Sequence, residues 1–172
     1  TDDHGNDTTT TLLVSGDLGR GDHPLIPGPG LPPSARTVLV ESTYGDSLHP
    51  DESDEIDRFA DLVSRTAQRG GVILIPAFAV DRTEVLLSVL RDLMASGRVP
   101  KLPVYVDSPM ALRVLEVYGA AMRTADPLVC HPAPVGADAD NLFDPGGGLH
   151  QCPTVEDSKS LNELTAPAII IS

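Results

Sequence analysis

Apolar residues recur at helical spacing in four segments of the chain and form short continuous runs in five others. A period of three to four residues is typical of an amphipathic helix, and a short apolar run between turn residues is typical of a strand. The predicted helices span residues 52–68, 83–96, 111–122 and 155–164. The predicted strands span residues 11–15, 37–41, 72–76, 104–106 and 168–172. Segment 124–153, rich in Pro, Gly and Asp, is expected to be irregular.

The pattern also predicts which side chains are buried. Strand 37–41 is expected to be buried, and the apolar run 72–75 is of the kind that is covered on both faces of a parallel sheet. In helix 83–96 the expected apolar stripe consists of Val85, Leu86, Val89, Leu90, Leu93 and Met94. The acidic cluster at residues 51–55 is interpreted as a helix start, because carboxylates favour the positive end of the helix dipole.

Strands that alternate with helices predict right-handed βαβ units, and therefore an α/β fold with a mostly parallel sheet flanked by helices. The chain opens one strand before a loop that carries Asp17, and it stops directly after strand 168–172. We therefore expect an internal piece of a longer protein.

Composition narrows the class of protein. The longest apolar runs are far shorter than the roughly 20 residues that cross a bilayer, so no membrane span is expected. Two cysteines cannot build a disulfide framework, which favours a reducing, cytoplasmic location. The net charge of −13, with twelve scattered basic residues, argues by itself against nucleic-acid binding, which usually requires a basic face.

Three carboxylates each follow an apolar run, at Asp17, Glu41 and Asp107. Ligands of open parallel sheets bind beyond the carboxyl ends of the strands, so these residues are candidates for metal binding or proton transfer. A single carboxylate at such a position can instead cap the next helix or turn. Three of them in one short chain favour the functional reading.

Four strings of residues carry a resemblance to a known family: 15–20 (SGDLGR), 40–46 (VESTYGD), 75–82 (IPAFAVDR) and 106–111 (VDSPMA). In this order and spacing they resemble the β-CASP branch of the metallo-β-lactamase superfamily, which includes ribonuclease J and the pre-mRNA 3′-end endonuclease. The resemblance implies a ribonuclease in which two zinc ions activate a water that attacks an RNA phosphodiester.

The resemblance also implies roles for individual residues. Asp17 matches the aspartate that bridges the two zinc ions, and Glu41 matches the acidic residue that orients a downstream histidine for proton transfer. Phe78, Arg82 and Ser108 fall in the matched strings and are predicted to bind substrate. Arg82 has a structural ion pair as its alternative role. The family often has glycine where this chain has Asp81.

By the same resemblance, residues 1–45 are closing strands of a metallo-β-lactamase αββα domain, and residues 46–172 are an incomplete β-CASP domain that selects RNA. The family's His-x-His-x-Asp-His motif does not occur in this sequence. With one matched ligand we expect the isolated piece to hold no zinc and to be inactive. A homodimer of the intact protein is compatible with the resemblance.

Other readings remain open. A non-catalytic α/β module that binds RNA or a protein is the main alternative, and a Rossmann-like nucleotide-binding domain is disfavoured because the glycine fingerprint is missing. The pairs Cys130-His131 and His150-x-Cys152 lack zinc-finger spacing and are interpreted as loop residues. His23 and His49 are interpreted as exposed, with a place in the cleft as the alternative.

Overall fold

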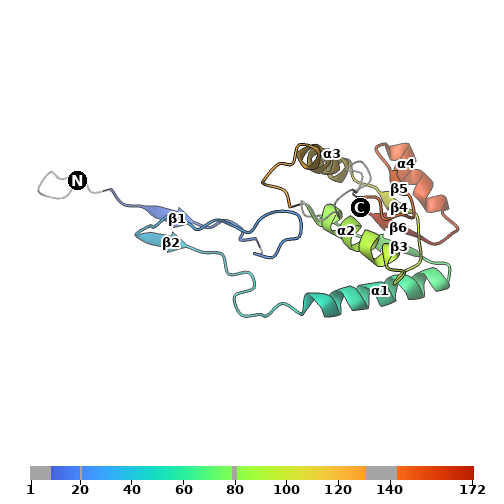
Figure 1. Cartoon of the computed structure of the whole chain (residues 1–172), viewed down its shortest axis with the longest axis horizontal. Coiled ribbons are helices and arrows are strands. Elements are labelled where there is room, and N and C mark those ends of the chain that lie inside the picture. The colour runs from blue at the N-terminus through green and yellow to red at the C-terminus, as the bar shows by residue number, and fades with distance from the viewer. Residues whose placement is uncertain (1–8, 20, 79–80, 131–142) are drawn as a thin grey trace, which may run out of the picture. The chain divides into compact units, whose positions relative to one another are not determined.

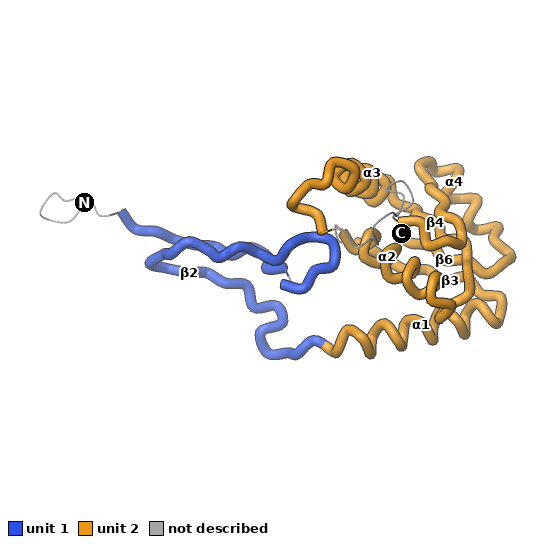
Figure 2. Tube along the Cα trace, in the orientation of Figure 1, with its two compact units in different colours: residues 1–49 blue, residues 50–172 orange. Residues whose placement is uncertain are grey.

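The computed structural model describes residues 9–19, 21–78, 81–130 and 143–172. Figure 1 labels the helices and strands along the chain, and Figure 2 colours the two compact units into which the chain divides, residues 1–49 and 50–172. This division falls four residues after the boundary expected from the sequence. The assignment of the first unit to a metallo-β-lactamase domain stays a prediction.

The first unit contains two short parallel strands, β1 (Leu12–Val14) and β2 (Thr37–Leu39), with Leu13 opposite Val38. The prediction that the second of these strands is buried was wrong. Val38 is 48% exposed and Leu39 is 56% exposed. The reason is that a two-stranded sheet on its own cannot cover either of its faces.

The second unit is built on four parallel strands in the order β3-β6-β4-β5. Their bounds are β3 Val72–Ile75, β4 Val104–Val106, β5 Leu149–Gln151 and β6 Ala168–Ile171. The helices that connect them are α1 Glu52–Gln68, α2 Arg82–Ala95, α3 Pro109–Arg123, α4 Val155–Ser160 and the short 3₁₀ helix η2 Leu161–Glu163. The predicted α/β class with a parallel, helix-flanked sheet is confirmed.

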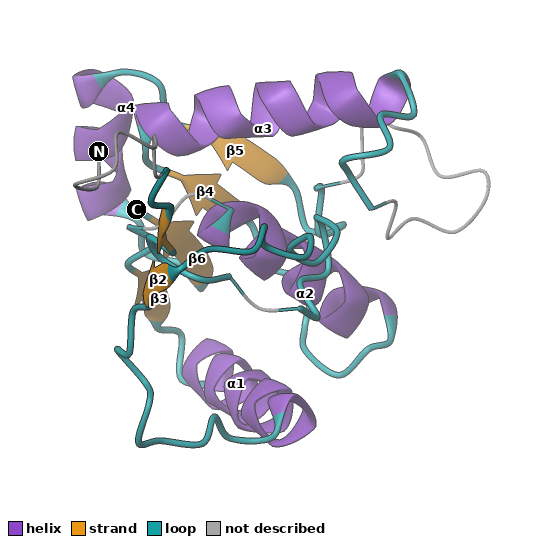
Figure 3. Cartoon of the chain, turned by 90° about the vertical axis from the view of Figure 1, so that its left-hand side faces the viewer, coloured by secondary structure: helices purple, strands orange, loops and turns teal. Residues whose placement is uncertain are grey.

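Helices cover both faces of this sheet (Figure 3). On one face, Ile170 packs with Cys152 and with Leu161 of η2, and Tyr105 lies against this cluster. Because side chains alternate along a strand, Ile169 and Ile171 point to the opposite face, where α2 lies. Both isoleucines are fully buried, so β6 is the central strand of the core.

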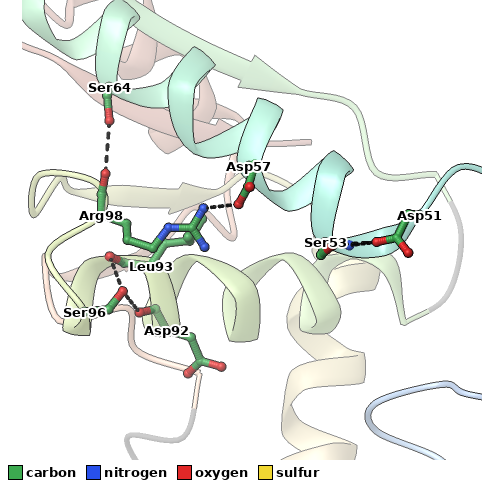
Figure 4. A network of polar contacts seen from close by, with 8 residues as sticks. All are labelled: Asp51, Ser53, Asp57, Ser64, Asp92, Leu93, Ser96 and Arg98. Atoms are coloured by element: carbon green, nitrogen blue, oxygen red, sulfur yellow. Dashed lines mark hydrogen bonds and ion pairs between the residues drawn. The ribbon is translucent and has the colours of Figure 1, made fainter.

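Helix α1 is held by polar contacts at its first turn and at two positions further along (Figure 4). Asp51 caps the first turn by accepting a hydrogen bond from the Ser53 amide at 2.9 Å. Further along, Asp57 pairs with Arg98, whose carbonyl accepts a hydrogen bond from Ser64 Oγ at 3.3 Å. Arg98 follows α2, so these contacts join α1 to the turn that leads into β4.

Three predictions of burial or structure in this unit were wrong. Strand β3 is not covered on both faces, since it is an edge strand with Leu74 68% exposed. Strand β5, Leu149–Gln151, lies within the segment that was expected to be irregular. It was not predicted because its three residues show no apolar alternation. Helix α2 buries Thr83, Glu84, Leu87 and Ser88 as well as Leu90, Leu93 and Met94, whereas Val85, Leu86 and Val89 are only half-buried.

No helix within the described ranges is both long enough and apolar enough to span a membrane.

Candidate active site

Asp17 and Glu41, which the sequence places 24 residues apart, line the same two adjoining pockets of the first unit. Parallel strands end at the same edge of a sheet, so the loops that follow β1 and β2 meet there. Residues 14–17 and 39–41 form one pocket, and Leu18, Thr43 and Tyr44 complete the other. The structure thus brings together two predicted site residues, although their roles stay predictions.

Ser15 joins the two strand ends just before the carboxylates. Its amide donates to the Leu39 carbonyl at 2.9 Å, and its Oγ accepts from the Glu41 amide at 3.0 Å. Gly16 then turns the chain with a φ of +58°, in the left-handed region that suits glycine. Ser15 thus ties the end of β1 to the residues after β2, directly beside Asp17 and Glu41, a role that sequence reasoning missed.

Glu41 is held in its ionised form. The Thr43 amide donates to Glu41 Oε2 at 2.8 Å. This bond, with help from the Thr43 hydroxyl, lowers the pKa of Glu41 below its usual value. Glu41 is therefore a carboxylate at neutral pH and can accept a proton or a hydrogen bond.

The pocket offers carboxylate oxygens as metal ligands but few other ligand atoms. Asp17 is exposed, and its carboxylate accepts no hydrogen bond from any described residue, so it is available to a cation. Across the described ranges there is no group of three or more His, Cys, Asp and Glu side chains that could hold a metal ion. The chemistry of Asp17 fits a single metal ligand, and the described residues do not supply a complete set of ligands around it.

The two histidines of the first unit have local partners. His23 Nδ1 accepts hydrogen bonds from the amides of Leu25 at 3.2 Å and Ile26 at 3.3 Å, so this histidine shapes its own loop. The ring of His49 lies 4.9 Å from the ring of Tyr44.

In the second unit the carboxyl ends of the strands form one continuous edge. Ser172 donates its amide to the Ile75 carbonyl at 3.0 Å, and its own carbonyl accepts from the Ala77 amide. On the other side the Asp107 amide donates to the Ile171 carbonyl at 2.8 Å. Asp107 Oδ2 accepts from Ser158 Oγ at 2.9 Å, so this third carboxylate fastens α4 to the sheet edge.

Phe78 and Ser108 stand in different environments at this edge. Phe78 follows β3 and is 87% exposed, which leaves its aromatic ring open to solvent. Ser108 is the N-cap of α3, where its Oγ accepts from the Ala111 amide at 3.3 Å. Ser108 therefore has a structural task that competes with its predicted role in substrate binding.

Replacing Ser108 with alanine is expected to lower the free energy of unfolding by about 1 kcal/mol, because the first turn of α3 loses its cap. Urea unfolding of the parent and variant measures this loss. Ser34, an exposed serine in a loop, provides the matched control when it too is replaced with alanine. Equal stability of the Ser108 variant and the parent would show that the cap is unimportant.

Arg82 is the exposed first residue of α2, and it makes no ion pair with any residue that the structure describes. The preceding Asp81 does not neutralise it. Asp81 Oδ1 instead accepts a hydrogen bond from the Tyr118 hydroxyl at 2.7 Å. Burial raises the pKa of Tyr118, and the bond to Asp81 adds to this effect, so the hydroxyl keeps its proton.

Glu84, two residues further along α2, is buried, and its Oε1 has no hydrogen-bond partner within the described part of the chain. Burial raises its pKa to about 7. Sequence reasoning missed this group because it lies between apolar positions of a helix, where a glutamate usually faces solvent.

The cysteine and histidine pairs form no metal site among the described residues. Cys152 is buried in the core, where burial raises the pKa of its thiol, and Cys130 is exposed. The ring of His150 stacks on Tyr105 with the centroids 4.7 Å apart. His131 lies outside the described residues.

The second unit is a parallel α/β unit, and the first unit brings two carboxylates together at the ends of its strands. Residues 83–172 match the Beta-Casp domain family, which is half of the chain. The chain therefore belongs to the β-CASP family, in the metallo-β-lactamase superfamily.

Relatives with assigned names agree. The chain is 37% identical over 163 residues to ribonuclease TTHA0252 of Thermus thermophilus, covering 94% of this chain and 36% of that protein. It is 34% identical over 109 residues to cleavage and polyadenylation specificity factor 73 of Drosophila melanogaster, covering 62% of this chain and 16% of that protein. It is 36% identical over 110 residues to the probable RNase MJ4 of Methanocaldococcus jannaschii, covering 62% and 24%. The chain thus spans about a third or less of the length of these relatives.

Proposed function

We propose that this chain is part of an RNA-processing nuclease that hydrolyses RNA phosphodiester bonds with two zinc ions. The observation that carries the proposal is the meeting of Asp17 and Glu41 in one pocket at the ends of β1 and β2. The named relatives support the class of substrate, since two of the three are called ribonucleases.

In this proposal Asp17 is a zinc ligand and Glu41 is a positioning group for proton transfer. Zinc, when bound, would neutralise charge on the phosphate and make a water easier to deprotonate. Asp17 contributes a carboxylate that accepts no hydrogen bond from any described residue. Glu41 contributes a carboxylate that the Thr43 amide keeps both ionised and fixed, so it can accept a hydrogen bond from a histidine supplied by the rest of the protein.

The second unit contributes contacts to RNA. The exposed ring of Phe78 provides a face on which a base can stack. The guanidinium of Arg82, which makes no ion pair with any described residue, provides a charge and a planar fork for a phosphate. With a net charge of −13, the chain has little general attraction for nucleic acid, so local contacts of this kind carry the binding.

Metal removal tests the proposal. The full-length protein is expected to cleave a labelled RNA, to lose cleavage after exhaustive chelation, and to regain it when zinc is added back. Metal analysis before and after chelation provides the second readout, with about two zinc ions per chain expected in the active protein.

Cleavage that survives complete removal of metal would overturn the mechanism. Binding of RNA without cleavage at any metal concentration would instead favour the non-catalytic binding module. A cytoplasmic location and a homodimer of the full-length protein stay predictions, which fractionation and light scattering test.

A further inference from the structure

Asp81 has a backbone conformation that its side chain disfavours. Its φ is +69° and its ψ is −13°, in the left-handed region where the Cβ of any residue but glycine is crowded. An aspartate that persists in such a conformation is a reason to look for a compensating contact.

The compensating contact is the hydrogen bond from Tyr118. Asp81 makes no capping bond to α2 with its side chain, although it stands at the N-cap position. Its Oδ1 instead accepts a hydrogen bond from the hydroxyl of Tyr118 in α3, 37 residues further along the chain. Tyr118 is 7% exposed, and its ring meets the ring of Phe143 edge-on with the centroids 6.2 Å apart. The partner of Asp81 is therefore itself fixed by packing.

The hydrogen bond between Asp81 and Tyr118 is made by the residue directly before Arg82. The Asp81 carbonyl accepts the hydrogen bond of the Val85 amide at 3.0 Å, which closes the first turn of α2 around Arg82. The bond to Tyr118 ties that turn to α3. It also directs the Asp81 carboxylate to a hydroxyl, so the carboxylate is not paired with the adjacent guanidinium. The same contact thus anchors the residue before Arg82, and the Arg82 guanidinium makes no ion pair with any residue that the structure describes.

We propose that Asp81 is a positioning residue, which through its hydrogen bond to Tyr118 holds Arg82 ready for a phosphate of the RNA. The inference rests on the proposed function, and it adds two residues that act only through Arg82. A glycine in place of Asp81 would relieve the backbone but would provide no hydrogen bond to Tyr118.

The test uses four variants of the full-length protein. Tyr118→Phe removes the donor, and Asp81→Gly removes the acceptor while relaxing the backbone. Asp81→Asn keeps an acceptor oxygen and tolerates the left-handed region. Tyr105→Phe is the matched control, since Tyr105 is half-buried on β4 and stacks on His150.

Two readouts are expected to move together. Tyr118→Phe and Asp81→Gly raise KM for RNA by about tenfold and leave kcat nearly unchanged. A tenfold change is the usual effect of losing one charge-assisted hydrogen bond, here the contact between Arg82 and a phosphate. They also speed hydrogen exchange of the Val85 amide, which needs no RNA to be measured. Asp81→Asn stays near the parent in both readouts, and so does Tyr105→Phe. In an Arg82→Ala background, Asp81→Gly has no further effect on KM, because coupled residues are not additive.

Different outcomes contradict the positioning role of Asp81 and the proposed nuclease function. If Arg82→Ala raises KM but Tyr118→Phe does not, the positioning role is wrong and the nuclease remains. If Val85 exchange is unchanged in Tyr118→Phe, the role is also wrong. Additive effects of Asp81→Gly and Arg82→Ala mean that Asp81 acts independently of Arg82, which overturns the inference. A full-length protein that neither binds nor cleaves RNA overturns the proposed function itself.

Discussion

Replacing Glu84 with glutamine is expected to raise the free energy of unfolding at pH 8 by about 3 kcal/mol and to change it little at pH 5. Glu84 is 1% exposed, and Oε1 finds no partner among the residues that the structure describes. A buried carboxylate is costly unless it is paired, so the folded protein favours the protonated form. Glutamine has nearly the same shape and carries no charge at any pH.

The pH dependence follows from the direction of the pKa shift. Burial raises the pKa of Glu84 from 4.5 to about 7, and the charge of Asp81 adds to the shift. Between these values the folded state holds a proton that the unfolded state has lost. The parent therefore loses stability as the pH rises through this window, and the loss is complete above about pH 7. The glutamine variant lacks this loss.

Urea unfolding of the parent and of Glu84→Gln at pH 5 and pH 8 measures the free energy of unfolding of each protein at each pH. The difference between the two proteins at each pH isolates Glu84 from every other titrating group. Glu116→Gln on the exposed side of α3 is the matched control, and no gain at pH 8 is expected from it. A Glu84→Gln variant that is less stable than the parent at pH 8 would mean that the carboxylate is ionised and paired in the folded state.

The helices and the inner strands could be predicted because their patterns are periodic and long. Helix α1 begins and ends at the predicted residues, Glu52 and Gln68, since an acidic first turn and the pair Gly70-Gly71 mark its limits. Strand β6 was predictable from an unbroken apolar run. The short edge strand β5 was not, because its hydrogen bonds to β4 fix it and its side chains carry no pattern.

Burial was predicted less well than secondary structure. An apolar run such as Val72–Ile75 shows that a strand can be covered, but neighbouring strands decide whether it is. In α2 the apolar residues extend around more than one side of the helix, so the sequence alone did not indicate which side faces the sheet. The packing chose the side that carries Thr83, Glu84 and Leu87.

Some of the residues at the candidate sites could likewise be predicted from the sequence, and others could not. Asp17 and Glu41 could be predicted because parallel strands bring their carboxyl ends to one edge, whatever the details of packing. The pair Asp81 and Tyr118 could not, since the residues are far apart in sequence and the left-handed backbone of Asp81 has no local signature. An aspartate before a helix predicts a side-chain cap of that helix. Asp81 instead accepts a hydrogen bond from Tyr118 of α3 and does not cap α2 with its side chain.

Glu41→Gln and Asp17→Asn are expected to inactivate the full-length protein in two distinguishable ways. Glu41→Gln lowers kcat by about 10²–10⁴, the usual contribution of a group that assists proton transfer, and leaves the metal content unchanged. Asp17→Asn loses bound zinc together with activity, because a neutral amide is a much weaker ligand than a carboxylate. Asp61→Asn, an exposed site on α1, is the matched control for both.

The pH profile separates Glu41 from a group that titrates during catalysis. The hydrogen bonds from Thr43 lower the pKa of Glu41, so it stays ionised across the neutral range. The ratio of kcat between the parent and Glu41→Gln is therefore expected to be constant over that range. A ratio that falls as the pH is lowered through neutrality would show that Glu41 itself gains a proton there, and the fixed positioning role would be wrong. Unchanged kcat with unchanged metal content would remove Glu41 from the mechanism altogether, while loss of zinc in Glu41→Gln would make it a ligand beside Asp17.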